Sequence, residues 1–193
     1  MRVLVACEFS GVVREAFRRR GHDAWSCDLM ASLDESPYHL EGDVLRVMDG
    51  NWDLMIAHPP CTWLCQAMRT NAARKDRPWV SAVYLQERDK AFAFVKLLHD
   101  CPIKKVAIEN PIGYLNGAWR KPDQTIRPWM FGHDCAKDVC LWLKNLPVLL
   151  PSRMVSPPYR KLDFWSNKRN PGGYSLKSLT FQGIADAMAE QWG

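Results

Sequence analysis

The sequence lacks several features that would place it in common classes of protein. No apolar run approaches the roughly 20 residues that a membrane-spanning helix needs. There is no Cys-x-x-Cys pair, and the seven cysteines have spacings that are poor for a zinc site, so we assign no metal. An odd number of cysteines also argues against a disulfide framework. The N-terminal apolar run is short and is interpreted as a strand and helix, not a signal peptide, so we expect a cytoplasmic protein.

The composition indicates a folded domain with basic segments. Hydrophobic residues make up 47% of the 193 positions, so we expect residues 1–193 to form a single domain. The formal net charge is +5, and basic residues cluster in RTNAARKDR, YRKLDF and NKRNPGG with aromatic residues nearby. Such clusters can be solvated surface, but phosphate contact and base stacking favour a nucleic acid partner. Six residues are candidates for phosphate contact: Arg69, Arg74, Arg160, Lys161, Lys168 and Arg169.

Apolar runs and helical periodicity alternate along the chain. Short apolar runs predict strands, and amphipathic patterns predict helices between them. Val83, Phe92, Val95 and Leu98 are expected on the inner side of the longest helix. This alternation predicts an α/β fold with a doubly wound, Rossmann-like sheet. The predicted strands are residues 3–7, 23–27, 54–57, 105–108 and 138–143, and the predicted helices are residues 12–20, 80–99 and 180–192.

The stretch DLMIAHPPCTWLC contains a buried strand that stops at two prolines. Proline fixes the backbone and donates no hydrogen bond, so the strand ends at Pro59 and Pro60. Cys61 then stands on a rigid turn at the carboxyl edge of the sheet, where open α/β sheets bind ligands. From its position alone, Cys61 is a nucleophile, a metal ligand or a core thiol.

Other predicted strands also end in residues that suit ligand binding. The turn EFSG follows the first strand, Asp28 follows the second, and Asp43 lies in a following loop. This turn has one glycine and does not match Gly-x-Gly-x-x-Gly, so a dinucleotide is not supported. An acid after the second strand suits ribose hydroxyl groups. A single-glycine turn followed by two acids fits S-adenosylmethionine better than a dinucleotide.

Cys61 and Glu109 follow neighbouring predicted strands, and each is next to or near a proline. A thiolate is a strong nucleophile, and burial can raise the pKa of a carboxyl group until it donates a proton. A thiolate adding to C6 of a pyrimidine, with an acid at N3, makes C5 nucleophilic. The two residues together therefore predict conjugate addition to a pyrimidine base.

The motifs FSG, Asp28, GDV, PPC and ENP, in this order, resemble those of the DNA cytosine-C5 methyltransferases. The resemblance covers most of residues 1–143 and the final helix. It implies that Cys61, after Pro60, is the nucleophile, that Glu109 contacts N3 and that Asn110 braces the loop. It also implies S-adenosylmethionine as the cofactor. The residues that it places near this cofactor are Glu8, Phe9, Ser10, Gly11, Asp28, Asp43, Pro59 and Gly183.

The chain departs from this family in three ways. The first motif of the family usually has more glycines, and here Val12 and Val13 take their place. Its Gln-x-Arg-x-Arg motif is not intact, and Lys137 stands where an arginine that helps to bind the base and backbone is expected. The family also inserts a target-recognition domain late in the chain, and residues 150–177 form only a short basic and aromatic stretch in its place. The size and ending resemble compact versions encoded by bacteriophages and prophages.

We therefore predict methyl transfer from S-adenosylmethionine to C5 of cytosine in DNA through a covalent Cys61 adduct. One alternative is an amino-directed (N4 or N6) DNA methyltransferase, which has Asp/Asn-Pro-Pro-aromatic where this chain has His58 to Cys61. A second is a DNA-binding protein that kept the fold and lost turnover. A third is transfer of a group other than methyl. The predicted partner is DNA, single-stranded or with weak sequence specificity, bound by a monomer or a homodimer.

Overall fold

The computed structural model describes residues 1–72, 78–157 and 179–193. Its centre is a sheet of seven strands in the order β3-β2-β1-β4-β5-β7-β6. The strands are β1 (Arg2–Ala6), β2 (Asp23–Asp28), β3 (His39–Glu41), β4 (Leu54–Ala57), β5 (Lys105–Asn110), β6 (Gln124–Ile126) and β7 (Val139–Lys144). The helices are α1 (Val12–Arg19), α2 (Gln66–Ala72), α3 (Pro78–Asp100), α4 (Leu115–Ala118) and α5 (Gln182–Trp192), with short 3-10 turns η1 (Val44–Arg46) and η2 (Pro128–Met130).

The sheet has a parallel half and an antiparallel half. Strands β3, β2, β1, β4 and β5 pair in parallel, whereas β7 runs antiparallel to both β5 and β6. Every residue of β4 is buried, as is expected of a central parallel strand that is covered on both faces. Because parallel strands end at the same edge, the loops after β1, β2, β4 and β5 all lie along one side of the sheet.

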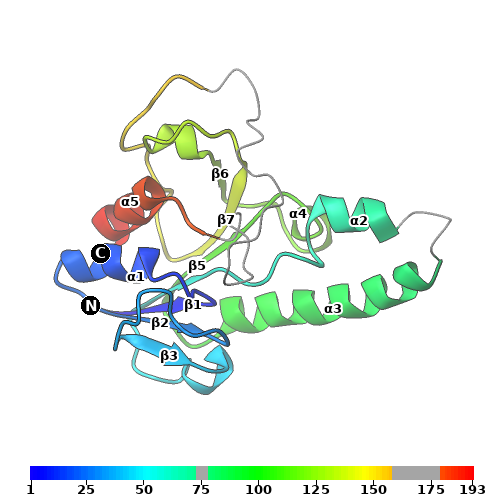
Figure 1. Ribbon diagram of the computed structural model, residues 1–193, viewed down its shortest axis with the longest axis horizontal. Helices are drawn as coiled ribbons and strands as arrows, with labels where there is room; N and C mark the ends of the chain where they lie inside the picture. The colour runs from blue at the N-terminus through cyan, green and yellow to red at the C-terminus, as the bar shows by residue number, and fades with distance from the viewer. Residues whose placement is uncertain (73–77, 158–178) are drawn as a thin grey trace.

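Helices cover both faces of the sheet. Figure 1 shows α1 and α5 next to each other, and Phe17, Met188 and Trp192 bury one face beneath them. On the other face, Val95 and Leu98 of α3 pack with the core around Met55 and Trp142. This arrangement confirms the predicted doubly wound α/β fold. In the described part of the chain, no helix has the length and apolar character to cross a membrane.

The predicted strands and the three predicted helices are confirmed, with end points that shift by no more than two residues. One prediction about the longest helix was wrong. Val95 and Leu98 are fully buried, but Val83 is 49% exposed. The first half of α3 extends beyond the sheet alongside α2 (Figure 1), so no core is available for Val83 to enter. The short elements β6 and α4 were not predicted.

Candidate active site

A cavity of about 270 Å³ opens between the carboxyl ends of β4 and β5. Ala57 of β4 pairs with Ile108 of β5, so the next residues along each strand, His58 and Glu109, lie beside each other. The segment before β7 and the start of α5 close the cavity from the other side. We call it the Cys61 cavity; its lining is His58, Pro59, Pro60, Cys61, Glu109, Asn110, Pro111, Lys137, Val139, Leu179, Thr180, Phe181 and Ile184.

Cys61 sits on a tight turn that is held by neighbouring backbone. Its carbonyl oxygen accepts hydrogen bonds from the backbone N–H groups of Leu64 (3.0 Å) and Cys65 (2.9 Å). Burial raises the pKa of the Cys61 thiol, and the nearby Cys65 and Glu109 raise it further. This direction favours the protonated thiol of Cys61 over the thiolate.

The loops after β4 and β5 are packed against each other through Gly113. The backbone N–H of Tyr114 donates to the carbonyl oxygen of Leu64 at 2.7 Å, and Cys65 forms a β-bridge with Gly113. A Cβ atom on Gly113 would lie 2.1 Å from the Leu64 oxygen. Only glycine permits this approach, so the turn that carries Cys61 is fixed relative to the loop that follows Glu109.

Glu109 forms a buried pair with His58. The His58 Nδ1 and Glu109 Oε2 atoms are 3.0 Å apart, and the two side chains are 9% and 18% exposed. Burial raises the pKa of Glu109, but the hydrogen bond from His58 and the charge of Lys137 outweigh it, so the pKa lies below its usual value. The expectation that burial would raise this pKa was therefore wrong, because the hydrogen bond from His58 stabilises the carboxylate.

The pKa of His58 is shifted in the opposite direction. Burial lowers the pKa of its ring, but the hydrogen bond and charge of Glu109, together with Glu8, outweigh burial and raise it. The Nε2 atom of His58 and the Oδ1 atom of Asn110 are buried and have no hydrogen-bond partner among the described residues. The Asn110 Nδ2 atom donates to the Pro59 carbonyl oxygen at 2.9 Å, which ties the end of β5 to the turn after β4.

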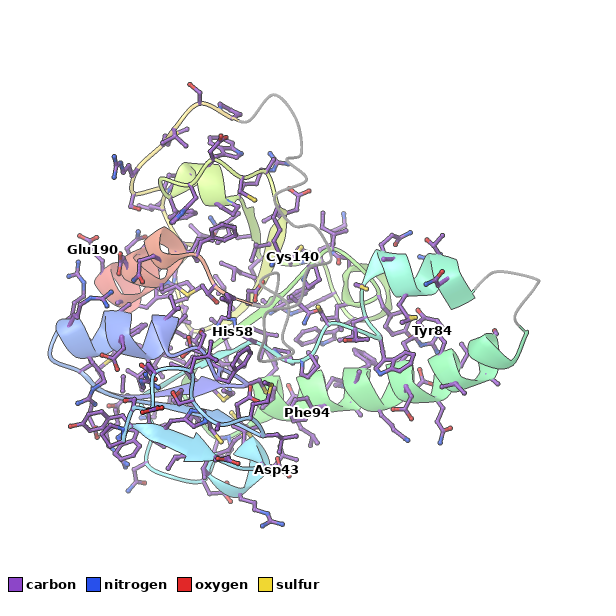
Figure 2. All side chains as sticks on the ribbon, in the orientation of Figure 1. Asp43, His58, Tyr84, Phe94, Cys140 and Glu190 are labelled. Atoms are coloured by element: carbon purple, nitrogen blue, oxygen red, sulfur yellow. The ribbon has the colours of Figure 1, made fainter. Side chains whose placement is uncertain are left out.

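A second cavity, of about 280 Å³, lies at the ends of β1 and β2. The Asp28 Oδ1 atom accepts from the Met30 N–H, and the Asp43 Oδ1 atom accepts from the Leu45 N–H, each at 3.0 Å. Burial raises the pKa of Asp28. In Figure 2, Asp43 beside η1 and Phe94 on α3 lie on the same side of the molecule. We call this the Asp28 cavity; its lining is Cys7, Cys27, Asp28, Leu29, Gly42, Asp43, Val44, Leu45, Pro60 and Phe94.

Pro60 lines both cavities, so the two meet at the turn that precedes Cys61. The structure thus brings two predicted cofactor residues, Asp28 and Asp43, to one side of Pro60. It brings Cys61 and Glu109, with the predicted residues Asn110 and Lys137, to the other side. A ligand in the Asp28 cavity and a ligand in the Cys61 cavity would be neighbours across this proline.

Glu8, Phe9, Ser10 and Gly11 line neither cavity. The Glu8 carboxylate is buried and accepts from the backbone N–H groups of Val13 (2.7 Å) and Arg14 (3.2 Å), so it caps the start of α1. Gly11 has a φ of 75° and forms the turn into α1. Their contact with a cofactor stays a prediction.

Gly183 lies at the start of α5, between two residues that line the Cys61 cavity. Its backbone N–H donates to the Nε2 atom of His133 at 2.9 Å, and a Cβ atom there would lie 1.9 Å from the Phe131 carbonyl oxygen. In this structure, glycine is required at this position by the contact with residues 131–133. Its contact with a cofactor also stays a prediction.

The predicted phosphate-contacting residues are mostly not placed. Arg69 is exposed on α2 and lines neither cavity. Most of the segment 150–177 lies outside the described residues. Five of the predicted phosphate-contacting residues also lie outside the described residues: Arg74, Arg160, Lys161, Lys168 and Arg169. Within the described ranges, no group of three or more His, Cys, Asp and Glu side chains is arranged to hold a metal ion.

Comparison with known proteins supports the fold. No protein-family model and no curated protein sequence matches this chain. Among solved structures, it is similar to a crystal structure described as a candidate DNA modification methyltransferase encoded within an E. coli prophage. The TM-score is 0.51 and the identity 13%, and the match covers 80% of this chain and 52% of the other. The chain thus shares a Rossmann-like α/β fold with that neighbour and spans about half of its length.

Proposed function

We propose that this protein is an S-adenosylmethionine-dependent DNA methyltransferase that modifies C5 of cytosine through a covalent bond between Cys61 and C6. The observation that carries the proposal is the shared cavity of Cys61 and Glu109, which come from the ends of adjacent strands. A thiol and a carboxyl group in one cavity can act on C6 and N3 of the same pyrimidine ring.

The Asp28 cavity suits the cofactor that this reaction needs. The Asp28 and Asp43 carboxylates offer acceptors for hydroxyl and amino groups, and Leu29, Val44 and Phe94 provide apolar surface for a flat ring. When bound, S-adenosylmethionine supplies an electrophilic methyl group. Since Pro60 borders both cavities, the residues that would hold the cofactor adjoin those that would hold the base.

Cys61 and Glu109 have complementary resting protonation states. The raised pKa of Cys61 keeps a proton on sulfur, and the lowered pKa of Glu109 favours its carboxylate. Addition requires the reverse arrangement, with a thiolate at C6 and a proton at N3. One proton must therefore pass from the thiol to the Glu109 side of the cavity as the Sγ–C6 bond forms. After methylation, a base or water takes the C5 proton, the C5–H electron pair forms the C5–C6 double bond, and the C6–Sγ bond breaks to release Cys61 as a thiolate. N3 returns its proton to Glu109, and the thiolate regains a proton from that side of the cavity.

The proposed substrate is DNA because several observations agree on a nucleic acid. The structural neighbour is described as a candidate DNA modification methyltransferase, and the net charge of this chain is +5. Lys137 lines the Cys61 cavity, where its charge can meet an oxygen of the base or backbone. In a duplex the target base must leave the stack before its C6 atom can meet Cys61. Residues 150–177 take the place of a recognition domain in this proposal.

The test is to identify the methylated nucleoside. DNA is incubated with the protein and S-adenosylmethionine that carries an isotopically labelled methyl group, then digested and analysed by mass spectrometry. We expect label in 5-methylcytosine, and its absence with Cys61→Ala. Label in N4-methylcytosine or N6-methyladenine would instead establish the amino-directed alternative. DNA binding without any transfer by the wild-type protein would establish a binding protein.

A further inference from the structure

His58 is the buried residue that the chemistry above does not use. It follows β4 directly, its side chain lines the Cys61 cavity, and its Nδ1 atom is 3.0 Å from the Glu109 Oε2 atom. Figure 2 shows His58 between α5 and Asp43, in the middle of the molecule. A side chain in this position can take part in the reaction or can only stabilise the fold. The geometry of the His58–Glu109 pair favours a part in the reaction.

We propose that His58 is the positioning residue for Glu109, holding its Oε2 atom so that Oε1 faces the base, and that the two side chains exchange protons with the base as one unit. This inference rests on the proposed function. It names the group that gives Glu109 its orientation and its charge during the reaction.

The hydrogen bond itself selects which oxygen serves the base. With Nδ1–H donating to Oε2, that oxygen is an acceptor and the acidic proton of the neutral carboxyl group is directed to Oε1. Among the described residues, the only hydrogen bond of the Glu109 carboxyl group is the one to His58, so Oε1 is left to the cavity. Asn110 holds the end of β5 against Pro59, which limits the movement of this carboxyl group.

The charges around the pair explain how it accommodates a transferred proton. Glu8 approaches His58 from the loop after β1, and Lys137 approaches both side chains of the pair from the segment before β7. Cys61 approaches Glu109 from the turn after β4. The acids favour the charged imidazole, and Lys137 favours the carboxylate. When N3 takes the proton from Oε1, the new carboxylate is stabilised by the Nδ1–H group. When Cys61 leaves C6, N3 gives that proton back, so no proton is gained or lost.

The variant His58→Asn separates the two proposed functions of His58, which are hydrogen bonding to Glu109 and proton exchange. The Asn Nδ2 atom can occupy the place of the His Nδ1 atom, so His58→Asn keeps a donor for Oε2 but cannot titrate. His58→Ala removes the donor as well. The matched control is His99→Asn, because His99 is also a largely buried histidine with Nδ1 bonded to an acid, Asp100 at 2.9 Å, and Nε2 unpartnered among the described residues. His99 does not line the Cys61 cavity.

The experiment measures how fast each variant forms a covalent adduct with 5-fluorocytosine DNA in the presence of S-adenosylmethionine, as a function of pH. We expect His58→Ala to slow adduct formation by about 100-fold, the scale of a misplaced catalytic group. His58→Asn should recover much of that loss but lack the inflection that we expect in the wild-type pH profile where His58 titrates. His99→Asn should match the wild type. A wild-type rate and pH profile in His58→Ala would overturn the proposal.

A second measurement does not depend on any reaction. In NMR titrations, the pKa of the His58 ring should lie above its ordinary value in the wild type and should fall in Glu109→Gln. An unchanged His58 titration would overturn the pairing. If the wild type shows the expected titration but never forms an adduct, the proposed methylation fails instead, which separates the two failures. Thermal unfolding of each variant establishes that it is folded.

Discussion

The pKa values of Asp28 and Glu109, which line the two cavities that meet at Pro60, are shifted in opposite directions. In the Asp28 cavity, burial raises the pKa of the acid, and no lysine or arginine lines the described walls. In the Cys61 cavity, His58 and Lys137 lower the pKa of Glu109 despite its burial. An acid whose cavity has no lysine or arginine in its described walls suits hydrogen bonds to neutral hydroxyl groups. An acid beside His58 and Lys137 suits a step in which charge and protons move. Under the proposed function, the Asp28 cavity would therefore bind the cofactor and the Cys61 cavity would carry out the chemistry.

The largest change should come from Glu109→Gln. Glutamine keeps the size of the side chain but cannot carry the proton for N3, so we expect methyl transfer to fall by about 10²- to 10⁴-fold. Cofactor affinity, measured by calorimetry, should stay unchanged because Glu109 does not line the Asp28 cavity. Glu87→Gln, at a surface acid paired with Lys90, is the matched control. An equal loss of cofactor affinity and turnover would contradict the idea that the two cavities have separate roles.

Asp28→Asn should produce the converse result. Losing a charged acceptor costs about 1.5 to 3 kcal/mol, so S-adenosylmethionine should bind roughly 10- to 100-fold more weakly. Methyl transfer should recover when the cofactor is saturating. Asp49→Asn, at an exposed acid on the opposite edge of the sheet, should leave the affinity unaltered. A turnover defect that saturation does not repair would show that Asp28 also serves the chemistry.

The glycines at 113 and 117 test the contact between the two loops of the Cys61 cavity. An added methyl at Gly113 would collide with the Leu64 oxygen, whereas at Gly117 it would meet nothing within 4 Å. Gly113→Ala should therefore destabilise the fold by about 1 to 3 kcal/mol and lower turnover as Cys61 moves. Gly117→Ala should do neither. Both are measured by denaturant unfolding and methyl transfer, and equal behaviour of the two variants would contradict the packing argument.

The smallest effect is a pH-dependent contribution of the His58–Glu109 pair to stability. The lowered pKa of Glu109 means that its contribution is present above its ordinary 4.5 and is lost as pH falls through the folded value. The raised pKa of His58 means that its contribution is present below 6.5 and is lost as pH rises through the folded value. The free energy of unfolding of the wild type should therefore exceed that of His58→Asn most between pH 4.5 and 6.5, by about 1 to 2 kcal/mol. Denaturant unfolding measures this difference. A constant difference across pH would contradict the pairing.

Much of the fold could be predicted because its central elements carry strong local patterns. Leu54–Ala57 is a short apolar run that is followed closely by two prolines, and α3 and α5 are long and amphipathic. Strand β6 escaped prediction because its three residues, Gln124–Ile126, have no such pattern and form only through pairing with β7. Val83 was misplaced because helical periodicity does not reveal where the sheet beneath a helix ends.

The sequence motifs singled out individual candidate residues but not the network that surrounds them. The motif order identified Cys61 and Glu109, and the structure places both in one cavity. The pairing of His58 with Glu109 spans 51 positions and follows from the register of β4 against β5. The available signal was that both are polar residues at the ends of neighbouring strands. The direction of the Glu109 pKa depends on that pairing, so it could not be obtained from burial alone.

The most direct test of the account is to locate the covalent bond. DNA that carries 5-fluorocytosine is incubated with the protein and S-adenosylmethionine, and the adduct is digested and mapped by mass spectrometry. The account predicts a DNA-linked peptide modified at Cys61, absent with Cys61→Ala and retained with Cys65→Ala, the thiol four residues away. An adduct that forms equally well with Cys61→Ala, or that maps to Cys65, would contradict it.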